Sequence, residues 1–292
     1  MMLLLAFLAP LIFGVLISNF LLGKLQLATP VLSSSIAVGV GIGSSSVLFI
    51  ILNLLYLPSF LIFLIEFALI GYAYWKYKAK IGFNAPHKTS KNYLFYAVAA
   101  LFAAAIALDV FIFFVDSAKD PHGLYDAWSY WNLRAKFISR APGEWSHLFK
   151  HLYFFHGDYP LLHSGFIARG WIMVGKETVW VPIITAFLFT FATIALLYAA
   201  VTHFTNSKTQ GMIAGLAMLC TPFYMVMGDS QYVDSPAGYF FLIAIVVFAL
   251  ADAQTNKKPY LYILAGLAAG LAAWTKNEGL LFIAVVYAAR IL

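Results

Sequence analysis

The sequence has little charge and almost no cysteine. Charged residues make up 10% of its 292 residues, far below the roughly 25% of soluble domains. The single cysteine, Cys220, excludes a disulfide within the chain and a cysteine-based metal cluster. The metalloprotease pattern HExxH is also absent, because Leu148, Phe149 and Lys150 separate His147 from His151. The low charge excludes an ordinary soluble domain.

Apolar runs fill the chain instead. Hydrophobic residues make up 63% of it, and a membrane-spanning helix needs about 20 mostly apolar residues. The sequence therefore predicts an all-α polytopic membrane protein with about nine transmembrane helices. The expected spans are residues 2–22, 31–54, 57–75, 93–115, 178–202, 210–227, 235–251, 260–274 and 279–292. No small-residue cleavage site follows the first run, so we expect it to remain as an anchor.

Two segments do not fit this pattern. The ninth run has only 14 residues, so we expect the chain to be truncated at its C-terminus. Residues 161–175 are apolar but short and contain Arg169, which predicts a helix tucked at the membrane surface. We divide the chain into residues 1–92, with the first spans and a basic cytoplasmic loop, and a core of residues 93–292 with a large outer loop, 116–177.

The basic residues predict which loops face the cytoplasm. They fall at alternate loops, as the positive-inside rule requires of cytoplasmic ones: Lys24, Lys76, Lys78, Lys80, Lys88, Lys91, Lys208, Lys257, Lys258 and Arg290. The opposite face then holds residues 116–177, 228–236 and 275–279, with nine of the twelve acidic residues. We expect a bacterial inner-membrane protein whose working surface lies outside the cytoplasm, although acids gather in any long aqueous loop. The net charge of +6 reports this orientation, and we expect the lipid bilayer, and no nucleic acid, as a partner.

The outer loop contains the stretch YDAWSYWNLRAKF, residues 125–137. Trp128, Trp131, Ala135 and Ile138 share one stripe at helical spacing, which predicts a helix lying in the headgroup layer with its tryptophans toward lipid. Asp126 opens this helix, either as an N-cap or as a catalytic carboxylate. A second surface helix is expected where Trp145, Leu148, Leu152 and Phe155 share a stripe.

The next polar stretch is HGDYPLLHSG, residues 156–165. Pro160 forces an extended or turn conformation there, which holds Asp158 where the chain re-enters the membrane. His147 and His151 have the i, i+4 spacing of a metal pair, but surface histidines at this spacing are common. We predict no metal and no cofactor, with a divalent metal at these histidines as the alternative.

Four stretches in this order resemble signature regions of bacterial GT-C glycosyltransferases: YDAWSYWNLRAKF, HGDYPLLHSG, QYVDSPAGYFFL and GLAAGLAAWTKNEGLLF. The nearest group is the branch related to dolichyl-phosphate-mannose–protein mannosyltransferases and lipid A aminoarabinose transferases. The resemblance implies transfer of a sugar, with inversion, from a polyprenyl-phosphate carrier to a glycan, lipid or protein acceptor outside the cytoplasm. It also implies that Asp126 is the general base. Many relatives carry an Asp-Glu pair there, whereas Ala127 follows Asp126 in this chain.

The chemistry needs a base for the acceptor hydroxyl and cations for the departing phosphate. Asp158 is the alternative base, or it orients the acceptor. Arg134 and Lys276 are phosphate candidates, and Glu278 is placed to fix Lys276, unless both belong to an ordinary turn. Further substrate-binding candidates are Tyr159, Gln231 and Asp234, although Asp234 before Ser235 and Pro236 also suits a helix cap. Asp109 is a candidate for the donor pocket, and Glu66 has no evident partner.

Two other functions stay open. A lipid-linked sugar flippase or transporter predicts inverted repeats, broken helices and acids at the bilayer midplane, whereas the sequence shows no repeat and places most acids in outer loops. A noncatalytic scaffold would use the loop helices as a docking surface.

Overall fold

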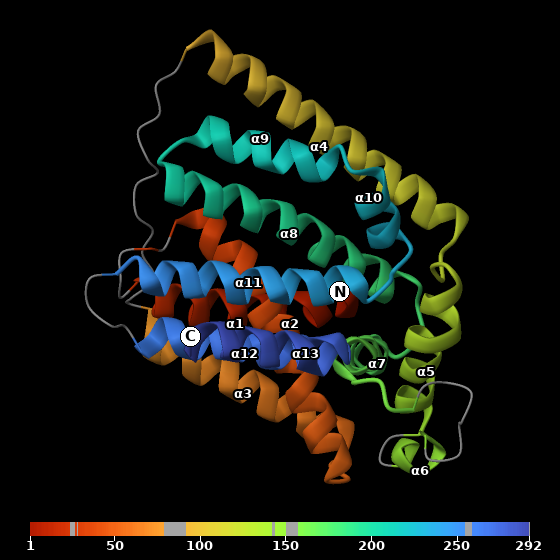
Figure 1. Ribbon diagram of the computed structural model, residues 1–292. Coiled ribbons are helices and arrows are strands. Elements are labelled where there is room, and N and C mark those ends of the chain that lie inside the picture. The colour runs from red at the N-terminus through yellow and green to blue at the C-terminus, as the bar shows by residue number, and fades with distance from the viewer. Residues whose placement is uncertain are drawn as a thin grey trace.

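The computed structural model describes residues 1–23, 27, 29–78, 92–141, 144–149, 157–254 and 259–291. Every regular element in these ranges is a helix, which confirms the all-α prediction. Figure 1 shows the long helices lying side by side, with α5, α6 and α7 at one end of the bundle and α5 running across the ends of the long helices. The basic residues between 79 and 91, on which the predicted orientation depends in part, lie outside the described residues.

Six helices in the described part of the chain are long and apolar enough to cross a membrane. They are α1 (Met2–Gly23), α2 (Pro30–Leu54), α3 (Ser59–Tyr77), α4 (Tyr93–Lys119), α8 (Trp180–Thr205) and α11 (Asp234–Asp252). The expected count of about nine is not confirmed. Of the other three expected spans, two form α12 (Pro259–Thr275) and α13 (Glu278–Ile291), with 17 and 14 residues, and both are shorter than the roughly 20 that a span needs.

The expected span 210–227 is broken in two. Its halves, α9 (Lys208–Leu219) and α10 (Pro222–Asp229), are bent by 68° and together make at most a seventh span. Thr221 between them has φ −102° and ψ 94°. The residue before a proline is pushed out of the helical region, so Pro222 ends α9 and begins α10 at its first turn.

One hydrophobic core joins both halves of the chain. It contains buried side chains from α1 and α2 together with others from α7 (Leu162–Val174), α8, α11 and α12. Glycine allows α1 and α2 to touch, because a Cβ on Gly41 would lie 2.1 Å from the carbonyl oxygen of Pro10. The hydroxyl of Tyr239 ties α11 to α2 by donating to the carbonyl of Ser35 and accepting from the N–H of Gly39 at 2.8 Å.

The short helix expected at the membrane surface is α7, and it is buried. Ten of its residues, Leu162 to Trp171, are buried, and it contacts α1, α2, α5 (Asn132–Arg140) and α8. The position at the membrane surface stays a prediction, and what the sequence did not predict is that the helix is covered by protein on all sides. With 13 residues the helix is too short to span the membrane, as its length suggested. Arg169 nevertheless points into the protein, because a carboxylate there accepts its hydrogen bonds.

That carboxylate is Glu66, for which the sequence offered no partner. The Nη2 and Nε of Arg169 donate to Glu66 Oε2 at 2.7 and 3.0 Å, and Ser45 donates to Glu66 Oε1 at 2.5 Å. Pro10 has no N–H for the carbonyl of Ala6, one turn earlier in α1, and Nη1 of Arg169 donates to that carbonyl at 2.9 Å. We call these groups, of Ala6, Ser45, Glu66 and Arg169, the buried polar cluster.

Candidate active site

The outer loop is fastened to the bundle through Gln231. Gly123 turns with φ +73°, and a Cβ on it would lie 2.5 Å from the carbonyl of Ser230, so glycine is required both by conformation and by contact. The buried side chain of Gln231 accepts from Asn132 Nδ2 at 3.0 Å and donates to the carbonyl of Pro121 at 3.2 Å. Both polar ends of Gln231 therefore bind protein groups, and we call this contact the Gln231 latch.

Asp126 does not cap a helix. It has helical dihedral angles, φ −65° and ψ −33°, and its side chain makes no capping hydrogen bond to the π-helical turn η2 (Ala127–Trp131) that follows. The N-cap interpretation is wrong, because an N-cap residue has non-helical angles. π-Helical turns are frequent at functional sites. Within the described residues, the Asp126 carboxylate makes no hydrogen bond or ion pair, so its oxygens are available to a substrate.

Three of the four residues of the expected stripe face the protein and not the lipid. Trp131, Ala135 and Ile138 are buried, whereas Trp128 is half exposed. The π-helical turn places one extra residue in the first turn of this segment, which separates Trp128 from the other three. α5 packs on α7, and the ring of Trp131 stacks on Tyr159 with centroids 5.2 Å apart. Trp145 on α6 (Trp145–Phe149) is also buried, donating to Asn53 Oδ1 at 2.6 Å.

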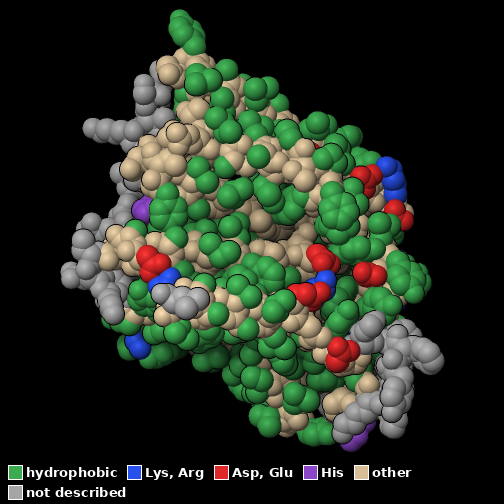
Figure 2. Space-filling model, in the orientation of Figure 1, with side chains coloured by type: hydrophobic (Ala, Val, Ile, Leu, Met, Phe, Trp, Pro, Cys, Tyr) green, Lys and Arg blue, Asp and Glu red, His purple; other side chains and the backbone are tan. Residues whose placement is uncertain are grey.

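A cavity of about 670 Å³ opens beside this stack. Its walls come from α5, α6, the segment 157–161, the end of α12 and the start of α13. Two charged side chains line it, Arg134 and Asp158, together with Asn277 and Trp274. Figure 2 shows that charged side chains form only a few small groups on an otherwise mostly hydrophobic face. The cavity therefore combines a mostly apolar wall with two charged side chains and the amide of Asn277.

Arg134 is the buried cation of this cavity, with only 2% of its surface exposed. Its Nη2 donates to the carbonyl of Tyr159 at 2.5 Å, and its Nε and Nη1 have no hydrogen-bond partner among the described residues. Burial lowers the pKa of Arg134 to about 10, an effect that the negative charge of Asp158 partly offsets. Arg134 therefore stays charged at neutral pH and retains donors for an anionic ligand.

The turn between α12 and α13 brings further predicted residues to the same place. Asn277 donates to Asp158 Oδ2 at 2.9 Å, while Lys276 Nζ pairs with Asp234 at 2.8 Å and with Glu278 at 3.2 Å. Burial lowers the pKa of Lys276, but Asp234 and Glu278 outweigh it, so the net shift is upward. Glu278 does hold Lys276, as expected, yet the two carboxylates leave Lys276 less available to a phosphate than Arg134.

The structure thus gathers some of the predicted residues and not others. Arg134, Asp158 and Tyr159 line the cavity, and Lys276, Asp234 and Glu278 form one group next to Asn277. Asp126 does not line the cavity; it lies near Tyr130, whose pKa is raised by partial burial, by Tyr125 and by the charge of Asp126.

The remaining candidates lie elsewhere. Gln231 is held in its latch, and Asp109 lies on α4, which packs on α9 and α10. His147 is exposed on α6, and His151 lies outside the described residues. No group of three possible metal ligands occurs in the described ranges, and the metal prediction stays a prediction. Sequence reasoning missed Asn277, although it lies inside the quoted stretch WTKNEG.

Comparison with known proteins finds one family whose model overlaps this region of the chain. Residues 158–291 match the family model of the dolichyl-phosphate-mannose-protein mannosyltransferases. A search of curated proteins and a search of solved structures each gave no match. The matched region includes Asp158, Asp234 and Lys276, while Asp126 and Arg134 precede it. This match supports the resemblance read from the motifs, that of a GT-C-like glycosyltransferase, over residues 158–291, and the long apolar helices indicate a multi-pass membrane protein.

Proposed function

We propose that this protein transfers a sugar from a polyprenyl-phosphate carrier to an acceptor hydroxyl on the extracytoplasmic face of the membrane, with inversion. The observation that carries the proposal is the cavity in which a buried, charged Arg134 with unpaired donors lies near Asp158, at the edge of the region that matches the mannosyltransferase family. A guanidinium in a water-poor site binds a phosphate strongly and stabilises the charge that develops on it as the sugar leaves.

Asp126 is the proposed general base. Inversion needs a carboxylate that removes the proton of the acceptor hydroxyl while that oxygen attacks the anomeric carbon from the side opposite the phosphate. Asp126 makes no hydrogen bond or ion pair among the described residues, whereas Asp158 already accepts from Asn277 and lies near Arg134. This difference favours Asp126 as the base and Asp158 as the group that orients the substrate. Substrate binding must then bring the acceptor between Asp126 and the cavity.

The test is an assay of purified protein with a polyprenyl-phosphate sugar, measuring release of polyprenyl phosphate. We expect Asp126→Asn to lower kcat by about 10²–10⁴-fold without changing the thermal unfolding midpoint. Asp120→Asn, in the same loop, is the matched control and should keep activity. If Asp126→Asn stays fully active while Asp158→Asn is inactive, the roles of the two carboxylates are reversed.

The break between α9 and α10 favours one second candidate, a transporter of lipid-linked sugars. Discontinuous membrane helices are typical of transporters, and these two helices meet at 68°. Movement of the donor across proteoliposomes without release of polyprenyl phosphate would support that function in place of transfer.

A further inference from the structure

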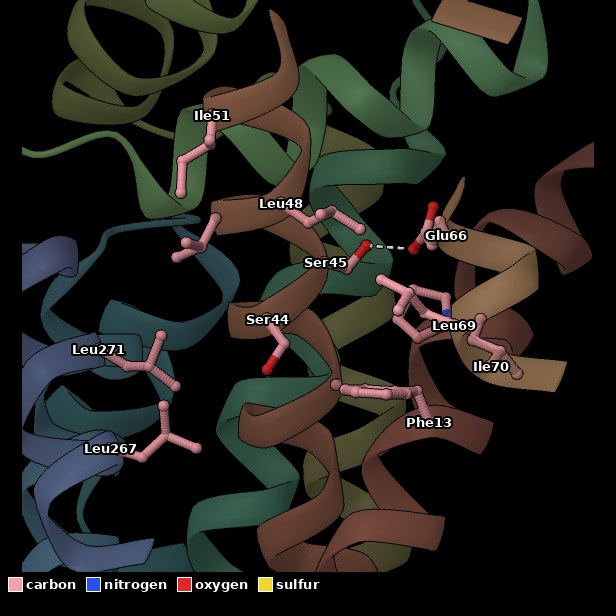
Figure 3. A pocket seen from close by; sticks show the side chains of 13 residues that line it. Phe13, Ser44, Ser45, Leu48, Ile51, Glu66, Leu69, Ile70, Leu267 and Leu271 are labelled. Atoms are coloured by element: carbon pink, nitrogen blue, oxygen red, sulfur yellow. Dashed lines mark hydrogen bonds between the residues drawn. The ribbon is translucent and has the colours of Figure 1, made fainter. Parts of the chain in front are cut away.

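A second cavity, of about 320 Å³, lies among α1, α2, α3 and α12. Figure 3 shows its wall, with Ser45 pointing to Glu66 of the buried polar cluster and Ser44 pointing away from Glu66. The lining is otherwise apolar, with Leu48, Leu69 and Leu267 among its side chains. It shares no lining residue with the cavity of Arg134 and Asp158. It is therefore a separate feature of the fold.

The cavity lies at the depth of the hydrocarbon core. Along α2 its lining runs from Gly41 to Ile51, and these ten steps cover about 15 Å at 1.5 Å per residue. Ile51 is three residues from the end of α2, and Glu66 is seven residues from the start of α3. Trp145 binds Asn53 at that end of α2, so the cavity belongs to the half of the membrane on the same side as the candidate active site.

The cavity opens sideways toward the bilayer. Ile51 and Leu69, on the spanning helices α2 and α3, are 50% and 44% exposed, and in a membrane such exposed surface on spanning helices faces lipid. The one carboxylate in the wall is already neutralised, because Glu66 is bound by Arg169 and Ser45. No charge is left to attract water or a charged ligand.

We propose that this cavity binds a single acyl chain of a bilayer phospholipid from that leaflet. An apolar cavity of about 150 Å³ stays dry and takes benzene, so one of twice that volume has room for roughly twelve carbons of a chain. A neighbouring helix, about 10 Å across, does not fit a space of this size. The bound chain covers the buried polar cluster on its lipid side and fills a void that otherwise costs stability.

Photolabelling tests this proposal. The protein is placed in vesicles of phosphatidylethanolamine and phosphatidylglycerol that contain a phospholipid with a diazirine in its acyl chain, and labelled peptides are identified by mass spectrometry. We expect the cavity-lining parts of α1, α2 and α3 to be labelled several-fold more than the exposed face of α4 around Leu101, which is 62% exposed. The double variant Leu48→Phe/Leu267→Phe should lower cavity labelling at least fivefold.

The controls decide between the possible outcomes. Leu101→Phe makes the same change on the exposed face of α4 and should leave cavity labelling unchanged. Ser44→Leu fills the cavity from another wall and replaces the double variant if that one does not fold, as judged by its thermal unfolding. Equal labelling of all lipid-facing helices, or unchanged labelling in a folded filled variant, overturns the proposal. Competition by polyprenyl phosphate but not by unlabelled phospholipid also overturns it, and assigns the cavity to the isoprenoid chain of the carrier.

Discussion

Arg169 shows how one side chain can organise a membrane protein. It is fully buried, and it connects α7 to α3 through Glu66 and to α1 through the carbonyl of Ala6. That carbonyl lacks its helical partner because of Pro10. In lipid an unpaired backbone carbonyl costs several kcal/mol. Arg169 therefore stabilises the fold in two ways, because it donates to the carbonyl of Ala6 and neutralises the charge of Glu66.

The buried pair should behave differently from surface pairs when it is broken. We expect Glu66→Met and Arg169→Met each to destabilise the protein by about 3–5 kcal/mol, because each leaves a charge without its partner in the interior. The double variant should be more stable than either single variant, since both charges are then gone. The unfolding midpoints of the four proteins, measured in the same detergent, check this order.

The Arg290–Asp252 pair is the matched control. It joins α13 to α11 at 2.6 Å, but its side chains are 34% and 51% exposed. Breaking it should have little effect on the midpoint. Additive losses in the Glu66/Arg169 double variant would show that the two charges do not depend on each other.

At the scale of elements, α5 is joined to the segment after α7 by a bidentate ion pair. Arg140 Nε and Nη2 donate to the two carboxylate oxygens of Glu177 at 2.6 and 2.8 Å. The hydrogen bonds from Arg140, and then its positive charge, lower the pKa of Glu177 against the opposing effect of partial burial. The pair therefore fastens the C-terminal end of α5 to the segment between α7 and α8.

This shift makes the contribution of the pair depend on pH. A carboxyl whose folded-state pKa is lowered stabilises the fold above its ordinary pKa, and loses that contribution as the pH falls through the lowered value. Because the pair is largely exposed, we expect Glu177→Gln to lower the unfolding midpoint by only about 1–2 °C near pH 7, and by less near pH 3, below the ordinary pKa of 4.5. Glu144→Gln, an exposed acid nearby, should show no such difference. A constant effect at both pH values would contradict the ionic origin.

The sequence predicted elements better than the directions in which they face. Hydropathy and length located α1, α2, α3, α4, α8 and α11, because a long apolar run has few alternatives. The face of the 125–137 segment could not be predicted, because one π-helical turn separates Trp128 from Trp131. The burial of Arg169 could not be predicted either. A charged residue in a short apolar helix indicates a position at the membrane surface unless a buried partner is known, and its partner Glu66 lies 103 residues away in the sequence. The order of the motifs did predict that Asp158 and the 276–278 turn lie on one face of the protein. The hydrogen bond between Asp158 and Asn277, in contrast, could be seen only in the fold.

At the scale of the whole molecule, the Gln231 latch fastens the outer loop to the bundle. The connection between α10 and α11 carries Gln231 in a left-handed conformation, with φ +60°. Its side chain reaches Pro121 and Asn132 on either side of Asp126, and the carbonyl of Ser230 accepts from the N–H of Leu124 at 3.2 Å. The latch therefore holds the segment that carries Asp126 in position over the helix ends.

Removing the Gln231 latch should make residues 121–132 more mobile without unfolding the rest of the protein. We expect Gln231→Ala to speed amide hydrogen exchange in residues 121–132, because the carbonyl of Pro121 loses its donor and Asn132 Nδ2 keeps only the carbonyl of His122, and an unsatisfied buried polar group costs about 1–3 kcal/mol. Gln231→Gly loses the same contacts but relieves the left-handed backbone, so it should be about 1 kcal/mol more stable than Gln231→Ala and equally loose in the loop. Gln210→Ala, at an exposed position on α9, is the control.

Unchanged exchange in residues 121–132 of both Gln231 variants would show that the loop is held by other contacts. If the loop does loosen, the rate of sugar transfer should fall in both variants alike, because the segment that carries Asp126 is then no longer held in one position.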